Sequence, residues 1–225
     1  MENYRIFDSE LDKLAHKVIQ MCSQVNQQIL DVVLALKTAD LKLAKKVITN
    51  DEYSNTLDVK IDKLCQKIFA LQQPVASDLR YIISALKINN DLERIGDHAV
   101  SIAKRIEPLQ DYLQLVEELG IDAIGLKTTD LFSDVVQIVK THDLTFADQI
   151  ITKAEEIKEA CRKIASTMLT EMMHQSEVVV VAANILIIIN LLERVASYST
   201  NIAESITFVV NGEIVKHKKH NETNL

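Results

Sequence analysis

The fold of this chain is decided by a stretch that occurs twice, as NNDLERIGDHAVSIAK at residues 89–104 and as INLLERVASYSTNIAE at residues 189–204. Apolar residues recur every three or four positions in the first copy, which is the spacing of one face of an α-helix. The first copy carries two carboxylates four residues apart, Glu93 and Asp97, whereas the second keeps Glu193 and has Ser197 at the other position. The chain therefore contains a helical repeat whose acidic pair is complete in one copy only.

The repeat extends well beyond these two stretches. The segments DVV at 31–33 and KTADL at 37–41 recur as DVV at 134–136 and KTHDL at 140–144, an offset of 103 (134 − 31). Self-similarity at a fixed offset indicates duplication of one supersecondary unit. We expect an all-α fold of two tandem, similar three-helix bundles, at residues 1–108 and 109–212, followed by a C-terminal tail at 213–225.

The composition agrees with a helical chain, because its 225 residues include only 4 Gly and 2 Pro. We expect six helices, at about residues 7–37, 40–72, 77–106, 111–141, 143–174 and 176–211. Their expected end signals are N-caps at Asp40, Ser77 and Asp143, allowed interruptions at Gly120 and Gly125, and a left-handed C-terminal cap at Gly212. The Val- and Ile-rich run at 178–189 has strand propensity, but its place in the repeat predicts a helix.

Charge and residue usage narrow the classes of function. The net charge is −7, so we expect no non-specific nucleic-acid binding. The three cysteines, Cys22, Cys65 and Cys161, have no metal-binding spacing, and we expect buried thiols in a reducing cytoplasm. The acidic start predicts no signal peptide, and the apolar run at 178–189 is too short to span a bilayer, so any membrane contact should come through a partner.

A candidate metal site follows from helical geometry. Glu93 and Asp97 lie nearly opposite the apolar stripe of their helix, and the preceding helix offers a row of oxygen ligands at spacings of four, three and four. That row consists of Asp51, Asn55, Asp58 and Asp62. If the two helices are neighbours, these hard oxygen ligands suit Mg, Mn, Ca or iron better than structural zinc. The alternative is an ordinary solvated acidic face.

The second half has lost this set as a unit. At the same offsets Asp51, Asn55, Asp58, Asp62 and Asp97 are replaced by Ala154, Lys158, Cys161, Ala165 and Ser197. We therefore expect at most one strong metal site, in the first half, with the second-half site doubtful because only Glu193 is retained.

Other candidate motifs give weaker support for a functional site. Glu171 and His174 have the spacing of a di-iron carboxylate motif, but such sites need a second copy that the sequence lacks. His98 borders the apolar stripe and is expected at the edge of the core, while Arg80 and Arg94 are expected to cap helices or pair with acids. The sequence contains no phosphate-binding Gly-rich loop and no nucleophile elbow, so we expect no catalytic residues.

The segments LQQPVASDLR (71–80) and ALKINNDLERIGDHAVSIAKR (85–105) strongly resemble the PhoU family of phosphate-signalling regulators. The segments FDSELDKL, KKVITNDEY and ERVASYSTNIAESITFVVNGEIVKH are similar to that family too, so the resemblance covers nearly the whole chain. It implies two three-helix bundles whose outer faces bind metal clusters, described with iron or zinc, through E/DxxxD motifs. Carried over residue by residue, Glu93, Asp97 and Asp51 match, Asp58 is a conservative match, and Asn55 stands where an acid is common.

The resemblance also implies a function. The expected protein is a cytoplasmic, homodimeric adaptor that restrains phosphate uptake and phosphate-regulon signalling. Its expected partners are the ATPase subunit of the phosphate ABC transporter and the sensor histidine kinase of the regulon. Two alternatives stay open: a metal-dependent helical-bundle enzyme using the region of Asp51 and Asp97, and a metal-buffering bundle without a phosphate role.

Overall fold

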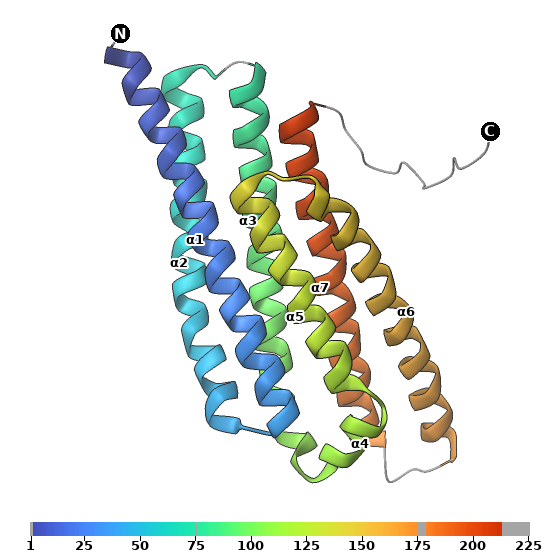
Figure 1. Ribbon diagram of the computed structural model, residues 1–225. Helices are drawn as coiled ribbons and strands as arrows, with labels where there is room; N and C mark the ends of the chain where they lie inside the picture. Colours follow the sequence, from blue (N-terminus) through green and yellow to red (C-terminus); the bar gives the residue numbers. More distant parts are fainter. Residues whose placement is uncertain (1, 75, 175–178, 213–225) are drawn as a thin grey trace, which may run out of the picture.

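The chain folds as a long all-α bundle, seen in a computed structural model (Figure 1). The structure describes residues 2–74, 76–174 and 179–212, with side chains described for 7–74, 77–172 and 179–212. Its elements are α1 (Glu2–Thr38), α2 (Leu41–Gln72), α3 (Ala76–Ala103), the 3-10 helix η1 (Glu107–Tyr112), α4 (Leu113–Glu118), α5 (Ile121–Thr141), α6 (Thr145–His174) and α7 (Val179–Asn211). The all-α prediction is confirmed, while the predicted start of the last helix near residue 176 and the tail at 213–225 lie outside the described residues.

Most predicted end signals act where expected. Asp40 Oδ1 accepts hydrogen bonds from the backbone N–H groups of Lys42 (2.9 Å) and Leu43 (3.0 Å), which satisfies two free donors at the start of α2. Asp143 Oδ1 accepts one from Thr145 N at 3.0 Å, before α6. Gly212 closes α7 with φ +72°. The Ser77 cap is wrong, because α3 begins at Ala76 and Ser77 is a first-turn residue.

The fourth predicted helix is divided into η1, α4 and α5. Gly120 ends the short α4 in the left-handed region, with φ +71°, and α5 starts immediately after it. The interruption allowed at Gly125 is wrong, since α5 runs through it without a break. Gly125 instead permits close packing: a Cβ there would lie 2.9 Å from Val33 Cγ1 of α1.

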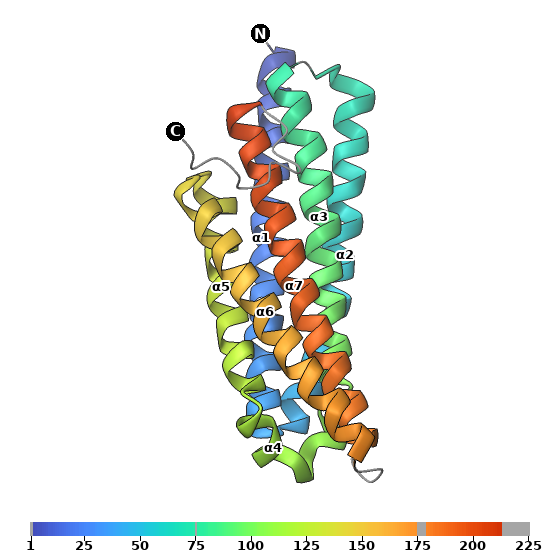
Figure 2. The same cartoon turned by 90° about the vertical axis from the view of Figure 1, so that its right-hand side faces the viewer.

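The two three-helix units lie side by side rather than end to end. Helices α1, α2 and α3 form one unit, and α5, α6 and α7 form the other, with η1 and α4 linking them at one end (Figures 1 and 2). The units meet where α1 packs antiparallel to α5 and α3 packs antiparallel to α7, so these four helices form the centre and α2 and α6 lie outside.

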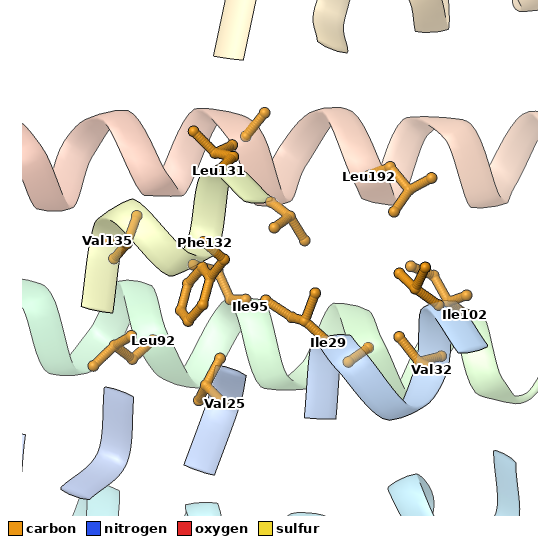
Figure 3. Packing of buried hydrophobic residues seen from close by; sticks show 14 of the residues in the cluster. Val25, Ile29, Val32, Leu92, Ile95, Ile102, Leu131, Phe132, Val135 and Leu192 are labelled. Carbon is orange, nitrogen blue, oxygen red and sulfur yellow. The ribbon is translucent and has the colours of Figure 1, made fainter. Parts of the chain in front are cut away.

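One continuous hydrophobic core fills that centre. Figure 3 shows Phe132 of α5 beside Ile95 of α3, while Leu192 of α7 lies further along the core, toward Ile102. The apolar stripe on the helix of Glu93, which continues past the end of α3 to Ile106, is buried at 0–3% exposure and comprises Ala85, Ile88, Leu92, Ile95, Ala99, Ile102 and Ile106. Burial of this stripe against α1, α2 and α7 fixes which face of α3 remains outside.

Helix α7, which begins at Val179 within the predicted 178–189 run, is 33 residues long and apolar enough to cross a membrane by length and composition alone. Its packing indicates another role. Val181, Ile185, Ile188 and Leu192 are buried at 0–3% exposure, and the helix lies against α3, α5 and α6. It is the core helix of the second unit.

The predicted burial of the cysteines is confirmed. Cys22, Cys65 and Cys161 are free thiols with 0–2% exposure. Burial raises the pKa of each to about 12, so the thiolate form that reacts with electrophiles and metals is suppressed at neutral pH.

Candidate functional site

The acidic residues predicted from sequence gather along the contact between α2 and α3. Asp51 and Asp58 come from α2, and Glu93 and Asp97 come from α3, which packs beside it. Gly96 of α3 lies close to Asp51, since an added Cβ there would be 3.5 Å from Asp51 Oδ1. We call Asp51, Asp58, Glu93 and Asp97 the acidic cluster.

Partial burial and neighbouring carboxylates raise the pKa values of two members of the acidic cluster. Partial burial raises the pKa of Glu93, and the negative charges of Asp97, Asp58 and Asp51 raise it further. Burial and the neighbouring Asp51 likewise raise the pKa of Asp97, against the opposing effect of Lys104 and Arg94. Three other carboxylates therefore act on Glu93, with Arg94 opposing them.

Buried amides contact the cluster from the core side. Gln28 of α1, only 2% exposed, donates from Nε2 to Asp51 Oδ1 at 3.0 Å and accepts at Oε1 from Ser54 Oγ at 3.0 Å. Asn89 of α3, 1% exposed, donates from Nδ2 to Asp58 Oδ1 at 2.7 Å and, more weakly, to Asp62 Oδ1 at 3.3 Å. Each of these α2 carboxylates is thus hydrogen-bonded by a side chain from another helix.

Asn55 lies beside the acidic cluster. It is exposed, and its Nδ2 donates to Asp51 Oδ2 at 3.2 Å. Among the side chains that the structure describes, no group of three or more His, Cys, Asp or Glu is already arranged to hold a metal ion. The ligand type fits a hard cation, although Asp51 Oδ2 accepts from Asn55, an exposed amide that a cation would have to displace.

The second half lacks this arrangement. Ala154 and Cys161, which replace Asp51 and Asp58, are buried at 0% and 2% exposure. Ser197, in place of Asp97, donates from its hydroxyl to the Glu193 carbonyl of its own helix at 3.1 Å. Lys158 pairs with Glu155 at 2.8 Å. Glu193 therefore has none of the acidic neighbours that accompany Glu93 in the first half.

Sequence reasoning missed the supporting residues Gln28, Ser54, Asn89 and Gly96. A signal for them was available in the repeat: at offsets of 103 and 100 their copies are Leu131, Ile157, Ile189 and Ala196. The first half alone combines the acids with buried polar groups behind them.

The remaining candidate residues make packing and hydrogen-bond contacts between helices. His98 is half-buried with its ring against Tyr198 of α7, at a centroid distance of 5.6 Å, and burial together with Arg194 and Arg94 lowers its pKa. Arg94 donates to Tyr198 Oη at 3.2 Å. Arg80 lies against the end of α7 at Gly212, where an added Cβ would be 3.5 Å from its Cζ. The motif of Glu171 ends at His174, whose side chain lies outside the described residues.

The fold and the acidic cluster define the class as a duplicated three-helix protein with an acidic cluster on one of its two units. Comparison with known proteins identifies the family. The PhoU domain model matches residues 18–106 and 121–206, one match in each unit.

Relatives match over nearly the full length. The "Phosphate-specific transport system accessory protein PhoU homolog" of Caulobacter vibrioides is 32% identical over 213 residues, covering 92% of this chain and 90% of its own. "Phosphate-specific transport system accessory protein PhoU" of Escherichia coli K12 is 30% identical over 213 residues, covering 94% and 88%.

Solved structures agree. The crystal structure of PhoU from Pseudomonas aeruginosa has a TM-score of 0.83 at 30% identity, over 92% of this chain and all of that one. The structure of the phosphate transport system regulatory protein PhoU from Streptococcus pneumoniae has a TM-score of 0.84 at 31% identity, over 93% and 99%. This chain therefore belongs to the PhoU family, and its role is regulatory rather than enzymatic.

Proposed function

We propose that this protein is a negative regulator of phosphate uptake and of phosphate-regulon signalling. It acts as a cytoplasmic adaptor between the phosphate ABC transporter and a sensor histidine kinase. The observation that carries the proposal is the match to phosphate-specific transport accessory proteins across both helical units. A protein of this kind works by presenting helical faces to partners, which agrees with a fold made almost entirely of long helices.

The regulatory role is tested by deleting the gene and following a phosphate-regulon reporter in phosphate-replete medium. Deletion should switch the reporter on despite abundant phosphate, and the wild-type gene supplied in trans should restore repression. Repression that persists in the deletion strain would refute the proposal.

The adaptor role is tested by capture of the tagged protein from phosphate-replete cells, with identification of the bound proteins. The ATPase subunit and the histidine kinase should both be recovered. If the protein is instead a metal-buffering bundle, the alternative that the acidic cluster favours, neither partner should be captured. Deletion of the gene should then leave the reporter unchanged. Light scattering of the purified protein tests the homodimer that the family resemblance implies.

We also propose one cation site at the acidic cluster, with Asp51, Asp58, Glu93 and Asp97 as ligands. A bound cation would neutralise Glu93 and Asp97, whose pKa values are raised by partial burial and by neighbouring carboxylates. The test is elemental analysis of the wild-type protein and of Asp97→Ala after dialysis against Mg²⁺, Mn²⁺, Ca²⁺ or Fe²⁺ in turn. Metal content should fall in the variant, and equal content in both proteins would remove Asp97 from the site.

A further inference from the structure

We propose that Gln28 and Asn89 are positioning residues for the cation site. They hold the carboxylates of Asp51 and Asp58 in place from the core side, and this role, rather than the stability of the fold, explains why two amides are buried there. The inference rests on the cation site proposed above. It concerns side chains that would not themselves be ligands.

The contact made by Gln28 fixes one carboxylate. Gln28 extends from α1 under α3, where the missing side chain of Gly96 leaves room: an added Cβ would lie 3.2 Å from Gln28 Oε1. Ser54 Oγ donates to this same Oε1 at 3.0 Å, which orients the amide so that Nε2 points to Asp51 Oδ1. A hydrogen bond to one carboxylate oxygen restricts the group, and the other oxygen, Oδ2, accepts from the exposed Asn55 amide at 3.2 Å, which a cation would displace.

Asn89 fixes the second carboxylate. Its Nδ2 reaches Asp58 Oδ1 at 2.7 Å, and also Asp58 O at 3.2 Å, so the amide spans the contact between α3 and α2. The opposite amide orientation would point Oδ1 at a carboxylate oxygen, so the cluster itself determines which way Asn89 faces. As a result Asn89 Oδ1 is buried without a hydrogen-bond partner among the described residues. A buried acceptor without a partner is unfavourable for folding, which indicates that the amide serves something other than packing.

The second half shows whether these buried polar residues are needed for the fold or for the cation site. At the same positions it has Leu131, Ile157, Ile189 and Ala196, all at 0–2% exposure. The same helical unit is therefore built with an apolar core where no acids need support. In the first half, polar groups occupy these core positions only where α2 and α3 carry the acidic cluster. Acids and supporting amides are present together in one unit and absent together in the other.

The test gives the first half the residues of the second. Gln28→Leu and Asn89→Ile are compared with the wild-type protein by calorimetric titration with Mn²⁺ and by thermal unfolding with and without Mn²⁺. The matched control is Gln27→Leu, which removes a neighbouring amide whose Nε2 donates to Asp31 Oδ1 at 2.7 Å, away from the cluster. We expect Mn²⁺ affinity to fall about 10- to 100-fold in each test variant and to stay unchanged in the control. The metal-free melting temperature should change no more in the test variants than in Gln27→Leu, because Asp51 and Asp58 are partly exposed and water can replace the lost hydrogen bonds.

The outcomes separate the two proposals. Wild-type affinity for Mn²⁺ in both test variants would overturn the positioning role while leaving the cation site intact. A metal-free melting temperature that falls further in both test variants than in Gln27→Leu would assign the amides to the fold instead, which also overturns it. To keep the measurement informative if either variant folds poorly, Gln28→Met and Asn89→Leu are measured alongside. A wild-type protein that binds none of Mg²⁺, Mn²⁺, Ca²⁺ and Fe²⁺ would remove the cation site itself, and the positioning role with it.

Discussion

His98 and Tyr198 are equivalent residues of the two repeats, and they meet each other across the contact between α3 and α7, with ring centroids 5.6 Å apart. The contact is reciprocal. Arg94 lies over the Tyr198 ring, with Cζ 5.9 Å from its centroid, and its repeat counterpart Arg194 lies close enough to His98 to lower the pKa of that imidazole. Antiparallel packing of duplicated helices brings equivalent positions together in this way, so α3 and α7 are related by an approximate two-fold axis near these side chains.

Replacement of Tyr198 should weaken the contact between the two units. Tyr198→Ala removes the ring that packs on His98 and under Arg94, and we expect a loss of about 2 kcal/mol in the free energy of unfolding. Tyr198→Phe keeps the ring and loses only the hydroxyl that accepts from Arg94, so it should lose less than about 1 kcal/mol. Urea unfolding of the three proteins measures both values. Equal losses in the two variants would mean that the hydroxyl, not the ring, holds α3 to α7.

The second contact between the units depends on the absence of a side chain. Gly125→Ala would place a Cβ 2.9 Å from Val33 Cγ1, and we expect overpacking between α1 and α5 to cost about 1–3 kcal/mol. Val33→Ala in the same chain should recover part of this loss, because it removes the atoms that clash. Differential scanning calorimetry checks both. A double variant no more stable than Gly125→Ala alone would refute a direct clash.

The helices could be predicted from sequence more completely than their packing. The stripe that includes Leu92 and Ile95, and the caps at Asp40 and Gly212, depend on local spacing and local hydrogen bonds. The side-by-side arrangement of the units does not. An apolar stripe shows which face is buried but not which helix covers it, so the pairing of α1 with α5 appears only in the structure. Gly125 shows the same limit, since a glycine that permits close packing looks like a glycine that breaks a helix.

Only part of the candidate site could be predicted from sequence. Helical spacing placed Glu93 and Asp97 on one face, and neighbouring helices brought Asp51 and Asp58 to them. The orientation of Asn55 could not be predicted, because it depends on which partner takes its amide. Gln28 lies within the core of α1, where a lone polar residue in an apolar stripe carries no visible role until its partner Asp51 is located.

The carboxylate of Glu10 should make stability depend on pH in the acidic range. Glu10 is 7% exposed and accepts from Lys13 Nζ at 2.9 Å and from Lys67 Nζ at 3.2 Å, and the Lys13 hydrogen bond in particular lowers its pKa. A carboxyl whose pKa is lower in the folded state stabilises the fold above its ordinary pKa, and this contribution is lost as the pH falls through the folded value. Glu10→Gln should therefore be less stable than the wild type by about 1 kcal/mol at pH 7 and should approach it below about pH 4.

Urea unfolding at several pH values between 7 and 3 measures this difference. Glu159→Gln provides the control, because Glu159 also pairs with a lysine, Lys163, at 2.8 Å but is exposed to solvent. Solvent screens that pair, so its removal should change stability less than removal of Glu10. A Glu10→Gln difference that grows toward low pH would show that the ion pairs are not its source.

Transfer of the acids alone should fail to create a second site. Ala154→Asp with Ser197→Asp restores carboxylates at the counterparts of Asp51 and Asp97, beside the retained Glu193. Ala154 is 0% exposed, and Leu131 and Ile157 stand where Gln28 and Ser54 support Asp51. We expect this buried, unsupported charge to cost about 3 kcal/mol or more at pH 7, measured by urea unfolding, and to add no Mn²⁺ binding in calorimetric titration.

Addition of the supporting residues should change that result. Leu131→Gln, Ile157→Ser and Ala196→Gly in the same chain give the carboxylate introduced by Ala154→Asp the hydrogen-bonding neighbours and the space that Asp51 has in the first half. Because a buried carboxylate that accepts hydrogen bonds is far less costly than one that does not, we expect part of the lost stability to return. A second Mn²⁺ equivalent should bind only in this fuller variant. If the two acids alone bind Mn²⁺ as well as the fuller variant does, the loss of ligands alone explains the asymmetry of the two halves, and the buried amides have no part in it.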